Sequence, residues 1–404
     1  MPVSKNAVLP ILAASLMVDG ESCINNCPKL SDVYACIKIT ESTGSVAFFE
    51  NDSLCVIYKD SNITQVPEEL CRAMRSSVLY LAPLLYRKGR VTISLPGGCN
   101  IGNRPVDIHL AGLEKLGAKV EISDGKITVS ALQGLKGTQI KLRVPSVGAT
   151  QTLIMAAATA KGLTVLKNCA REPEVVDLVR FLNLAGAKIA GAGRNEIIIQ
   201  GVQSLAGVSY TPVADRIVAA TLLAAVNACK GVCIINNYPA EYMQQFENLL
   251  KQTGLGIVHY SDSAMVYKYA HVKNNINVHT GFYPAFSTDM GPLLSGAMVN
   301  NKGALNICET VFENRFSYCS EFEKLGIKCS VNDRCYTQNG YKNHSEDATL
   351  KAQDLRAGAA LVVAALAKQG CCEIEGVEFI DRGYEKIEEV FSALGADIRR
   401  IQLD

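Results

Sequence analysis

Residues 116–120 read Leu-Gly-Ala-Lys-Val, a motif typical of a helix that ends and runs into a strand. Related motifs recur at 43–46, 185–189, 253–257, 325–329 and 394–398. The glycines of the six motifs, called the marker glycines below, lie at intervals of 68 to 73 residues: Gly44, Gly117, Gly186, Gly254, Gly326 and Gly395. Glycine is favoured just past a helix end, where the backbone turns left-handed. Six such stops at a near-constant interval predict six copies of one structural unit.

Each repeat opens with a helix rich in small apolar residues, at 6–16, 76–85, 149–160, 217–226, 290–298 and 357–367. A short strand follows, as at 91–95, 163–166, 232–235 and 372–374. A charged helix then ends at the marker glycine, as at 174–184 and 385–394, and further strands such as 196–200 complete the repeat. The first helix is apolar all round, which predicts burial, whereas the second has the three- and four-residue apolar spacing of an outer helix. The pattern predicts an α/β fold with helices inside and sheets around them.

The six repeats are expected to form two domains of three repeats each. The N-terminal domain is predicted at 4–213 and the C-terminal domain at 214–404, because a new apolar helix begins after Asp215 and Arg216. No long linker marks the boundary, so short hinge segments around a cleft are expected. The apolar stretch 7–18 matches the opening helices of the other repeats, and we interpret it as such a helix and not as a signal peptide. No strand precedes it, so one strand of the architecture is expected to be missing there.

The composition is that of a soluble globular protein, since 48% of the 404 residues are hydrophobic and 20% are charged. The formal net charge of +1 argues against a dedicated nucleic-acid-binding protein. No uncharged apolar run reaches the ~20 residues of a membrane span. The 15 cysteines are scattered, without a C-x-x-C pair or clustered histidines. They predict reduced, mostly buried thiols in a cytosolic protein and no structural zinc.

Distinctive polar or small residues lie at equivalent points, near the starts of the six apolar helices. They stand 37 to 42 residues before the marker glycines: Lys5, Arg75, Gly148, Arg216, Asp289 and Arg356. Helix N-termini carry partial positive charge and unpaired N–H groups, so together with Lys and Arg they favour an anion such as phosphate or carboxylate. The alternative interpretation is that Asp215, Asp289 and Asp354 are merely helix caps.

A Gly- and Pro-rich loop at 95–107 surrounds Cys99 and Arg104. In other repeats the connection between the strand and the charged helix is shorter. We therefore predict that residues 95–105 of this loop form a mobile lid. A thiol close to an arginine can have a favoured thiolate, which makes Cys99 a candidate catalytic residue. Because 14 other cysteines are present, an ordinary Cys99 stays an alternative at this point. Neither a G-x-G-x-x-G dinucleotide motif nor a Walker A loop occurs.

Several stretches together resemble the enolpyruvyl transferase family, in its branch that acts on UDP-N-acetylglucosamine. They are residues 4–6, 95–107, 146–150, 171–174, 284–290, 309–316, 354–356 and 381–385, within a resemblance that covers 3–400. The resemblance implies an inside-out α/β barrel of two domains with three repeats each. It implies transfer of the enolpyruvyl group of phosphoenolpyruvate to the 3-hydroxyl of UDP-N-acetylglucosamine, with release of phosphate. This is the first committed step of peptidoglycan synthesis, which places the protein in the cytoplasm. No metal, organic cofactor or nucleic-acid partner is implied.

The resemblance also implies roles for individual residues in a reaction that passes through a tetrahedral intermediate. Cys99 delivers a proton to C3 of phosphoenolpyruvate and can hold that substrate covalently, while Asp289 accepts or orients the sugar hydroxyl proton, with Asn6 beside it. Lys5, Arg104 and Arg382 hold phosphoenolpyruvate, Lys5 counting as catalytic, and Arg356 supports the anion site. Three groups of residues contact the nucleotide sugar. Its phosphates are contacted by Arg75, Ser146, Val147 and Gly148, and its uridine by Arg104, Pro105, Val106, Asp107 and Ile108. Its amino sugar is contacted by Val311.

The sequence also departs from the family pattern. The family has an N-terminal strand that belongs to its C-terminal domain, and we expect this chain to lack it. Pro145 removes one backbone N–H where the family usually has another residue. Two other functions stay open: 5-enolpyruvylshikimate-3-phosphate synthase activity, although the Cys99 loop belongs to the UDP-sugar branch, and a non-catalytic relative that binds a nucleotide sugar or a regulatory protein. The joint presence of Lys5, Cys99, Asp289 and Arg382 argues against the second.

Overall fold

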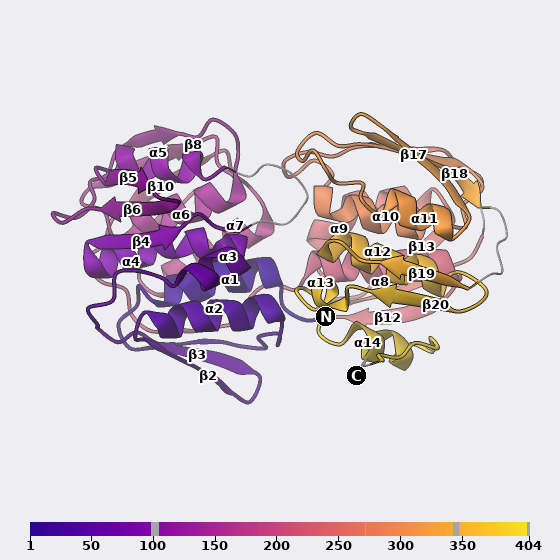
Figure 1. The fold of residues 1–404 in the computed structure, drawn as a ribbon, viewed down its shortest axis with the longest axis horizontal. Helices are drawn as coiled ribbons and strands as arrows, with labels where there is room; N and C mark the ends of the chain where they lie inside the picture. The colour runs from indigo at the N-terminus through magenta and orange to yellow at the C-terminus, as the bar shows by residue number, and fades with distance from the viewer. Residues whose placement is uncertain (98–104, 271, 342–346, 402–404) are drawn as a thin grey trace. The chain divides into compact units, whose positions relative to one another are not determined.

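The computed structural model describes residues 1–97, 105–270, 272–341 and 347–401. These residues divide into two compact units (Figure 1). The first, called the N-terminal unit, lies within 2–213, and the second, called the C-terminal unit, comprises the described residues of 214–404 together with Met1. Each unit has a hydrophobic core of its own, and the two cores share no residue.

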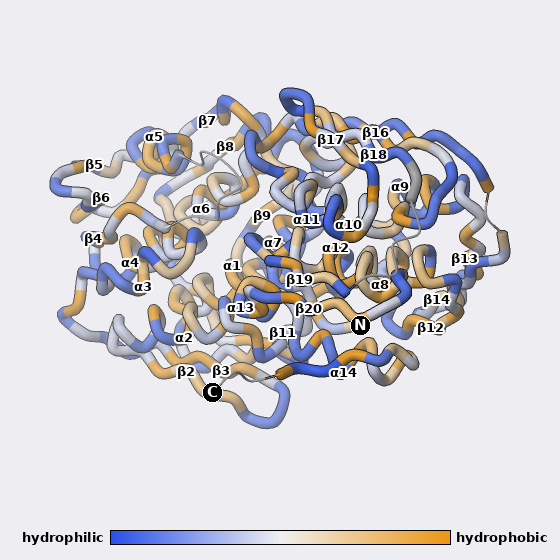
Figure 2. Tube along the Cα trace, turned by 45° about the vertical axis from the view of Figure 1, so that its right-hand side comes forward, coloured by the Kyte–Doolittle hydropathy of each residue, from blue (hydrophilic) through white to orange (hydrophobic). Residues whose placement is uncertain are grey.

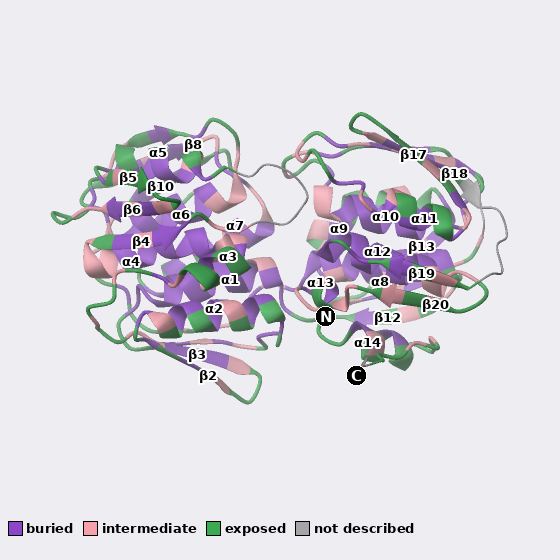
Figure 3. Cartoon of the chain, viewed as in Figure 1, coloured by how far each residue is buried: buried purple, intermediate pink, exposed green. Residues whose placement is uncertain are grey.

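The six apolar helices predicted from the repeat are present and form the interior of each unit. In the N-terminal unit they are α1 (Lys5–Ser15), α4 (Leu81–Lys88) after the 3-10 turn η1 (Arg75–Tyr80), and α6 (Val147–Ala158). In the C-terminal unit they are α8 (Arg216–Cys229), α10 (Gly291–Ala297) after the 3-10 turn η2 (Thr288–Met290), and α12 (Leu355–Leu366). Almost all residues of α1, α6 and α12 are buried (Figure 3). The α8, α10 and α12 helices pack against one another, so the prediction of interior helices is confirmed.

The second helix of each repeat is amphipathic. These helices are α2 (Ser31–Ser42), α5 (Asp107–Lys115), α7 (Pro173–Leu184), α9 (Ala240–Lys251), α11 (Cys319–Lys324) and α14 (Ile387–Ala393), with α3 (Glu68–Ala73) and α13 (Val377–Ile380) as short additions. In α9, Met243, Phe246 and Leu250 are buried at three- and four-residue spacing. All six marker glycines have φ between +76° and +105°, the left-handed conformation that favours glycine. The predicted repeat is therefore confirmed at each of its six copies.

Short sheets lie at the periphery of the units, and hydrophilic and hydrophobic residues alternate along many of their strands (Figures 1 and 2). The N-terminal unit contains β1 (Glu21–Ile24), β2 (Val46–Glu50), β3 (Ser53–Ile57), β4 (Arg90–Ser94), β5 (Lys119–Ser123), β6 (Lys126–Ser130), β7 (Gln139–Lys141), β8 (Leu163–Lys167), β9 (Lys188–Ala190), β10 (Glu196–Gln200) and β11 (Ser209–Tyr210). The C-terminal unit contains β12 (Val232–Asn236), β13 (Leu255–His259), β14 (Ser263–Lys268), β15 (Ile276–His279), β16 (Ala304–Cys308), β17 (Ile327–Asn332), β18 (Cys335–Tyr341), β19 (Ala348–Lys351) and β20 (Cys372–Glu375). In every repeat but the sixth, the strand after the apolar helix pairs antiparallel with the second strand after the marker glycine.

The strand before α8 pairs with the first repeat and not with β12, the strand that follows α8. β11 runs parallel to β1, with Cys23 opposite Ser209 and Ile24 opposite Tyr210. The pair is equivalent to three other parallel pairs, β7 with β8, β15 with β16 and β19 with β20. Within residues 1–97 no strand precedes the first apolar helix, and β11, from the end of the third repeat, occupies the position beside β1 that such a strand would have. Among the described strands, β12 has no parallel neighbour.

Two pairs of cysteines are joined in disulfides, Cys23–Cys55 and Cys308–Cys335. The partners lie directly opposite each other in neighbouring antiparallel strands, β1 with β3 and β16 with β18. The expectation of reduced thiols is therefore wrong at these four positions. The physical reason is that strand register, which the spacing of cysteines along the chain does not reveal, brings the sulfur atoms together.

Two of the marker glycines, Gly254 and Gly395, differ in how closely other backbone atoms approach them. An added Cβ at Gly254, where φ is +94°, would lie 2.3 Å from the carbonyl oxygen of Ala270, whereas at Gly395, where φ is +96°, it would meet no heavy atom within 4 Å. Both alanine variants incur the left-handed backbone penalty of about 1–2 kcal/mol, and Gly254→Ala adds a backbone clash. We expect Gly254→Ala to lower the melting temperature distinctly more than Gly395→Ala, measured by thermal unfolding. Equal shifts would contradict the close approach at Gly254.

Candidate active site

Asp289 lies in η2, at the start of the fifth repeat's apolar helix, and is held by two arginines. Its Oδ1 accepts a hydrogen bond from Arg315 Nη2, and its Oδ2 lies 3.2 Å from Arg356 Nε. The arginine side chains are only 2% and 4% exposed, whereas 28% of the Asp289 side chain is exposed. Two buried guanidinium groups favour the ionised carboxylate. The carboxylate is therefore fixed in position while part of it stays accessible.

The two other helix-start aspartates have a different role, because they cap helices. Asp215 accepts hydrogen bonds from the N–H groups of Ile217 and Val218 at the start of α8. Asp354 does the same for Arg356 and Ala357 at the start of α12, at 2.9 Å each. The cap interpretation is thus confirmed for Asp215 and Asp354. For Asp289 the structure instead records ion pairs with two arginines.

Arg315 was missed by the sequence reasoning as a site residue, although it stands in the motif 309–316. Besides its contact with Asp289, its Nε donates to the carbonyl oxygen of Thr288 at 3.1 Å. Arg356 completes the arrangement from the first turn of α12. Burial opposes the charge of Arg356, but Asp289 and the nearby Tyr384 outweigh it and raise the pKa of this guanidinium above its usual value. Arg356 therefore stays charged at every physiological pH.

Val311, the residue expected to meet the amino sugar, lies in a segment that follows β16. The carboxylate of Glu309, at the head of that segment, accepts hydrogen bonds from the N–H groups of Val311 and Phe312 and from the hydroxyl of Thr288. The segment is thereby joined to the turn that carries Asp289. The sequence pattern does not indicate this connection, because it depends on a contact between residues that lie 21 positions apart.

Lys5, the first residue of α1, is buried and paired with an acid. Its Nζ lies 2.8 Å from Asp32 Oδ2, and both side chains are 9% exposed. Asp32 was missed by the sequence reasoning, and the only signal for it is its place in the first turn of α2. The sequence argument required an anion near Lys5, and Asp32 meets part of that requirement. Removing one partner of a buried ion pair typically costs about 3–5 kcal/mol. Asn6 follows Lys5 in α1 and is half-buried.

The residues expected near the nucleotide phosphates lie at two helix starts of the N-terminal unit. Arg75 is the first residue of η1 and is half-buried. Ser146 caps α6, its Oγ accepting from the N–H of Ala149, and Val147 and Gly148 form the first turn. A Cβ at Gly148 would lie 3.1 Å from the imidazole of His109, so glycine allows α6 to start close against α5.

The residues expected on the uridine side lead into α5. Val106 is buried, Asp107 begins the helix and Ile108 follows it. A cavity of about 250 Å³ opens beside them, and its lining includes Asp107, Ile108, Lys115 and Arg143. Arg143 Nη2 donates to Asp107 Oδ2 at 2.8 Å. The lining of this hollow combines charged side chains with the apolar side chains of Ile140, Leu142 and Leu153.

Three of the expected residues need separate mention. Cys99 and Arg104 lie outside the described residues. Arg382 lies half-buried in the turn between α13 and α14. The N-terminal set (Lys5, Asn6, Arg75, 105–108, 146–148) and the C-terminal set (Asp289, Val311, Arg356, Arg382) belong to different units.

Comparisons with known proteins identify the family of this chain. The sequence profile of the family described as EPSP synthase (3-phosphoshikimate 1-carboxyvinyltransferase) matches residues 1–391. A relative from Caldanaerobacter subterraneus subsp. tengcongensis, named UDP-N-acetylglucosamine 1-carboxyvinyltransferase 2, is 40% identical over 98% of this chain and 95% of its own length. The UDP-N-acetylglucosamine 1-carboxyvinyltransferase of Trichlorobacter lovleyi is 41% identical over 98% of this chain and 94% of its own length. The chain belongs to the enolpyruvyl transferase family.

A solved structure supports the fold of this enolpyruvyl transferase. The enolpyruvyl transferase NikO from Streptomyces tendae superimposes with a TM-score of 0.88 at 24% identity, covering 99% of this chain and 94% of NikO. At that identity the likeness concerns the fold alone. The predicted fold class, a two-domain α/β architecture of the enolpyruvyl transferase type, is confirmed.

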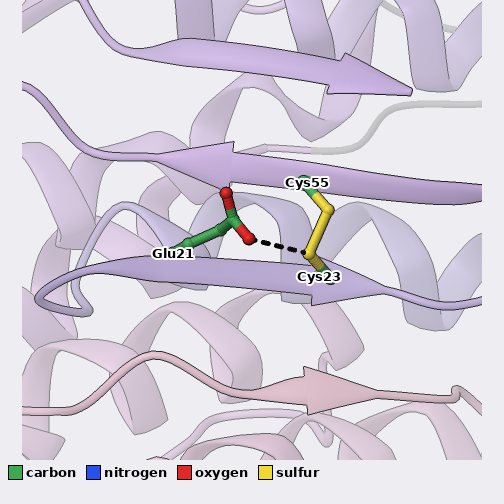
Figure 4. A group of neighbouring side chains, drawn as sticks. All are labelled: Glu21, Cys23 and Cys55. Atoms are coloured by element: carbon green, nitrogen blue, oxygen red, sulfur yellow. Dashed lines mark hydrogen bonds between the residues drawn. A yellow bond between two sulfur atoms is a disulfide. The ribbon is translucent and has the colours of Figure 1, made fainter. Parts of the chain in front are cut away.

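Within the described part of the enolpyruvyl transferase chain, one group of three side chains has the spacing of metal ligands. It consists of Glu21, Cys23 and Cys55, with Glu21 Oε1 3.6 Å from Cys23 Sγ (Figure 4). The two sulfur atoms are joined in a disulfide, so neither is a thiolate that could bind a metal. None of the helices in the described ranges has both the length and the apolar character that crossing a bilayer requires.

Proposed function

We propose that this enolpyruvyl transferase moves the enolpyruvyl group of phosphoenolpyruvate to the 3-hydroxyl of UDP-N-acetylglucosamine and releases phosphate. The observation that carries the proposal is Asp289, an accessible carboxylate between two buried arginines at a helix start. The two relatives that share about 40% of their residues with this chain over nearly its whole length support the choice of substrates. The product would enter peptidoglycan synthesis, and we place the reaction in the cytoplasm because both substrates are charged metabolites that do not cross membranes unaided.

The reaction needs one proton removed and one delivered. The oxygen of the sugar 3-hydroxyl attacks C2 of phosphoenolpyruvate while Asp289 accepts the proton of that hydroxyl. Asn6 orients the hydroxyl for this attack. Cys99 delivers a proton to C3, which gives the tetrahedral intermediate. Loss of a proton from C3 and departure of phosphate then restore the double bond. Each proton transfer by a positioned side chain contributes about 10²–10⁴-fold to the rate.

The basic residues stabilise the anions through each stage. Lys5, Arg104 and Arg382 bind the phosphate and carboxylate of phosphoenolpyruvate, since charge-assisted hydrogen bonds to such oxygens are among the strongest in proteins. Arg356 supports the anion site. Arg75 and the helix start at Ser146, Val147 and Gly148 bind the diphosphate. The segment from Arg104 to Ile108, through Pro105, Val106 and Asp107, borders the uridine, and Val311 meets the amino sugar.

A phosphate-release assay tests the proposal. Purified protein is supplied with phosphoenolpyruvate alone, with phosphoenolpyruvate and UDP-N-acetylglucosamine, and with phosphoenolpyruvate and shikimate 3-phosphate. We expect phosphate to appear in the second reaction only, together with a product whose mass equals that of the nucleotide sugar plus one enolpyruvyl group. Phosphate in the third reaction would favour the shikimate branch. Phosphate in none of them would favour a non-catalytic binding protein.

A further inference from the structure

Glu309 is a buried carboxylate whose hydrogen-bond partners, among the residues that the structure describes, are all neutral. It follows β16 directly and is 3% exposed. Its Oε1 accepts from the N–H groups of Val311 at 2.7 Å and Phe312 at 3.1 Å, and its Oε2 accepts from Thr288 Oγ1 at 2.7 Å. In the part of the chain that the structure describes, no basic side chain forms a salt bridge with it. Burying a carboxylate without a basic partner costs free energy unless hydrogen bonds replace those to water. The three donors provide these bonds and thereby fix the orientation of the Glu309 carboxylate.

The two oxygens of Glu309 reach different parts of the site. Oε1 shapes the segment 310–312, which is held on its other side by Thr310, whose N–H and hydroxyl bond to Thr280 at 3.0 and 2.7 Å. Oε2 holds Thr288, the residue directly before Asp289. The carbonyl oxygen of Thr288 also accepts from Arg315, which itself contacts Asp289. One carboxylate therefore joins the segment of Val311 to the turn of Asp289.

We propose that Glu309 is a positioning residue that sets the distance between the sugar-binding segment at Val311 and the proton acceptor Asp289. This inference rests on the proposed function, because it assumes that an N-acetylated pyranose lies along Val311. The sugar hydroxyl must then come within hydrogen-bond reach of Asp289, about 2.6–3.2 Å, for proton transfer to occur. A displacement of about 1 Å in such an arrangement can cost roughly 10²-fold in rate. Glu309 and its Thr288 bond are the link that prevents this displacement.

Two variants separate the two halves of the network. Thr288→Val removes the bond to Oε2 and leaves the turn at Val311 and Phe312 intact. We expect it to lower kcat about tenfold or more while the KM for UDP-N-acetylglucosamine stays within about twofold, because alignment and not binding is lost. Glu309→Ala removes all three bonds, and we expect both a lower kcat and a KM for the nucleotide sugar raised about tenfold. The KM for phosphoenolpyruvate should change in neither variant.

Two further variants act as controls. Glu309→Gln keeps an oxygen for the two N–H groups and an amide that can bond Thr288, so it should recover most of the KM effect and part of kcat. Thr337→Val removes a side-chain hydrogen bond of similar length, from the Thr337 hydroxyl to Asn306 in β16 at 2.9 Å. Glu309 follows that same strand. The Thr337→Val variant should leave both constants unchanged. Melting temperatures of all four variants show whether each protein is folded at the assay temperature.

The outcomes distinguish the inference from the function on which it rests. A wild-type protein that releases no phosphate from the two substrates overturns the proposed function, and this inference with it. An active wild type whose Thr288→Val variant keeps kcat within twofold overturns the inference alone. So does a Glu309→Ala variant that raises the KM of both substrates equally, since that result indicates a general structural role.

Discussion

Asp289→Asn is expected to lower kcat by about 10³-fold or more while the Kd for UDP-N-acetylglucosamine changes by less than about tenfold. Asparagine has the shape of aspartate but cannot accept the hydroxyl proton. The proton acceptor acts mainly in the transition state, so its loss affects turnover more than ground-state binding. Steady-state phosphate release measures kcat, and calorimetric titration with the nucleotide sugar measures Kd.

The arginines around Asp289 require a control for folding. The substitution leaves Arg315 and Arg356 without their shared anion, which also lowers stability. Asp215→Asn is the matched variant, because Asp215 also stands at a helix start but caps α8. We expect Asp215→Asn to reduce stability modestly and to keep kcat within a few-fold. Turnover near the wild-type value in Asp289→Asn would end the assignment of Asp289 as proton acceptor.

Cys99 is expected to be the thiol that reacts rapidly with fosfomycin, an epoxide that mimics phosphoenolpyruvate. A thiolate is the reactive form, and burial raises the pKa of Cys36 and Cys169 to about 12 and that of Cys229 to about 11. These thiols are therefore un-ionised at neutral pH. Prior addition of UDP-N-acetylglucosamine should accelerate labelling of Cys99, and intact-mass analysis with peptide mapping locates the adduct.

Among the cysteines that the structure describes, Cys319 could compete for this reagent. The pKa of the Cys319 thiol is lowered, chiefly by its hydrogen bond with Cys329, whose sulfur atom lies 3.3 Å away. A Cys319→Ser variant should be labelled as fast as the wild type. A Cys99→Asp variant should keep activity, because a carboxylic acid can still deliver a proton, and should resist the drug. An adduct at Cys319 in the wild type, with Cys99 unmodified, would remove Cys99 from the proposed mechanism.

The sequence by itself determined the repeat, the six apolar helices and the glycine stops of the charged helices. These features are local: helix periodicity, side-chain size and the left-handed glycine each depend on residues within a few positions of one another. All six marker glycines have the expected positive φ. Local reasoning could also place Lys5, Arg75, Asp289 and Arg356 at helix starts, because a position counted back from a helix stop does not require knowledge of the tertiary structure.

The tertiary structure alone decided which of these residues meet others. Lys5 pairs with Asp32 across 27 positions, and Asp289 with Arg315 across 26. Asp215 and Asp354 proved to be caps, whereas Asp289, alike in sequence, is held by arginines from other segments. β11 pairs with β1, more than 180 residues away, and two pairs of cysteines face each other through strand register. Such contacts depend on how helices and strands pack in three dimensions, and packing depends on the whole unit and not on any single segment.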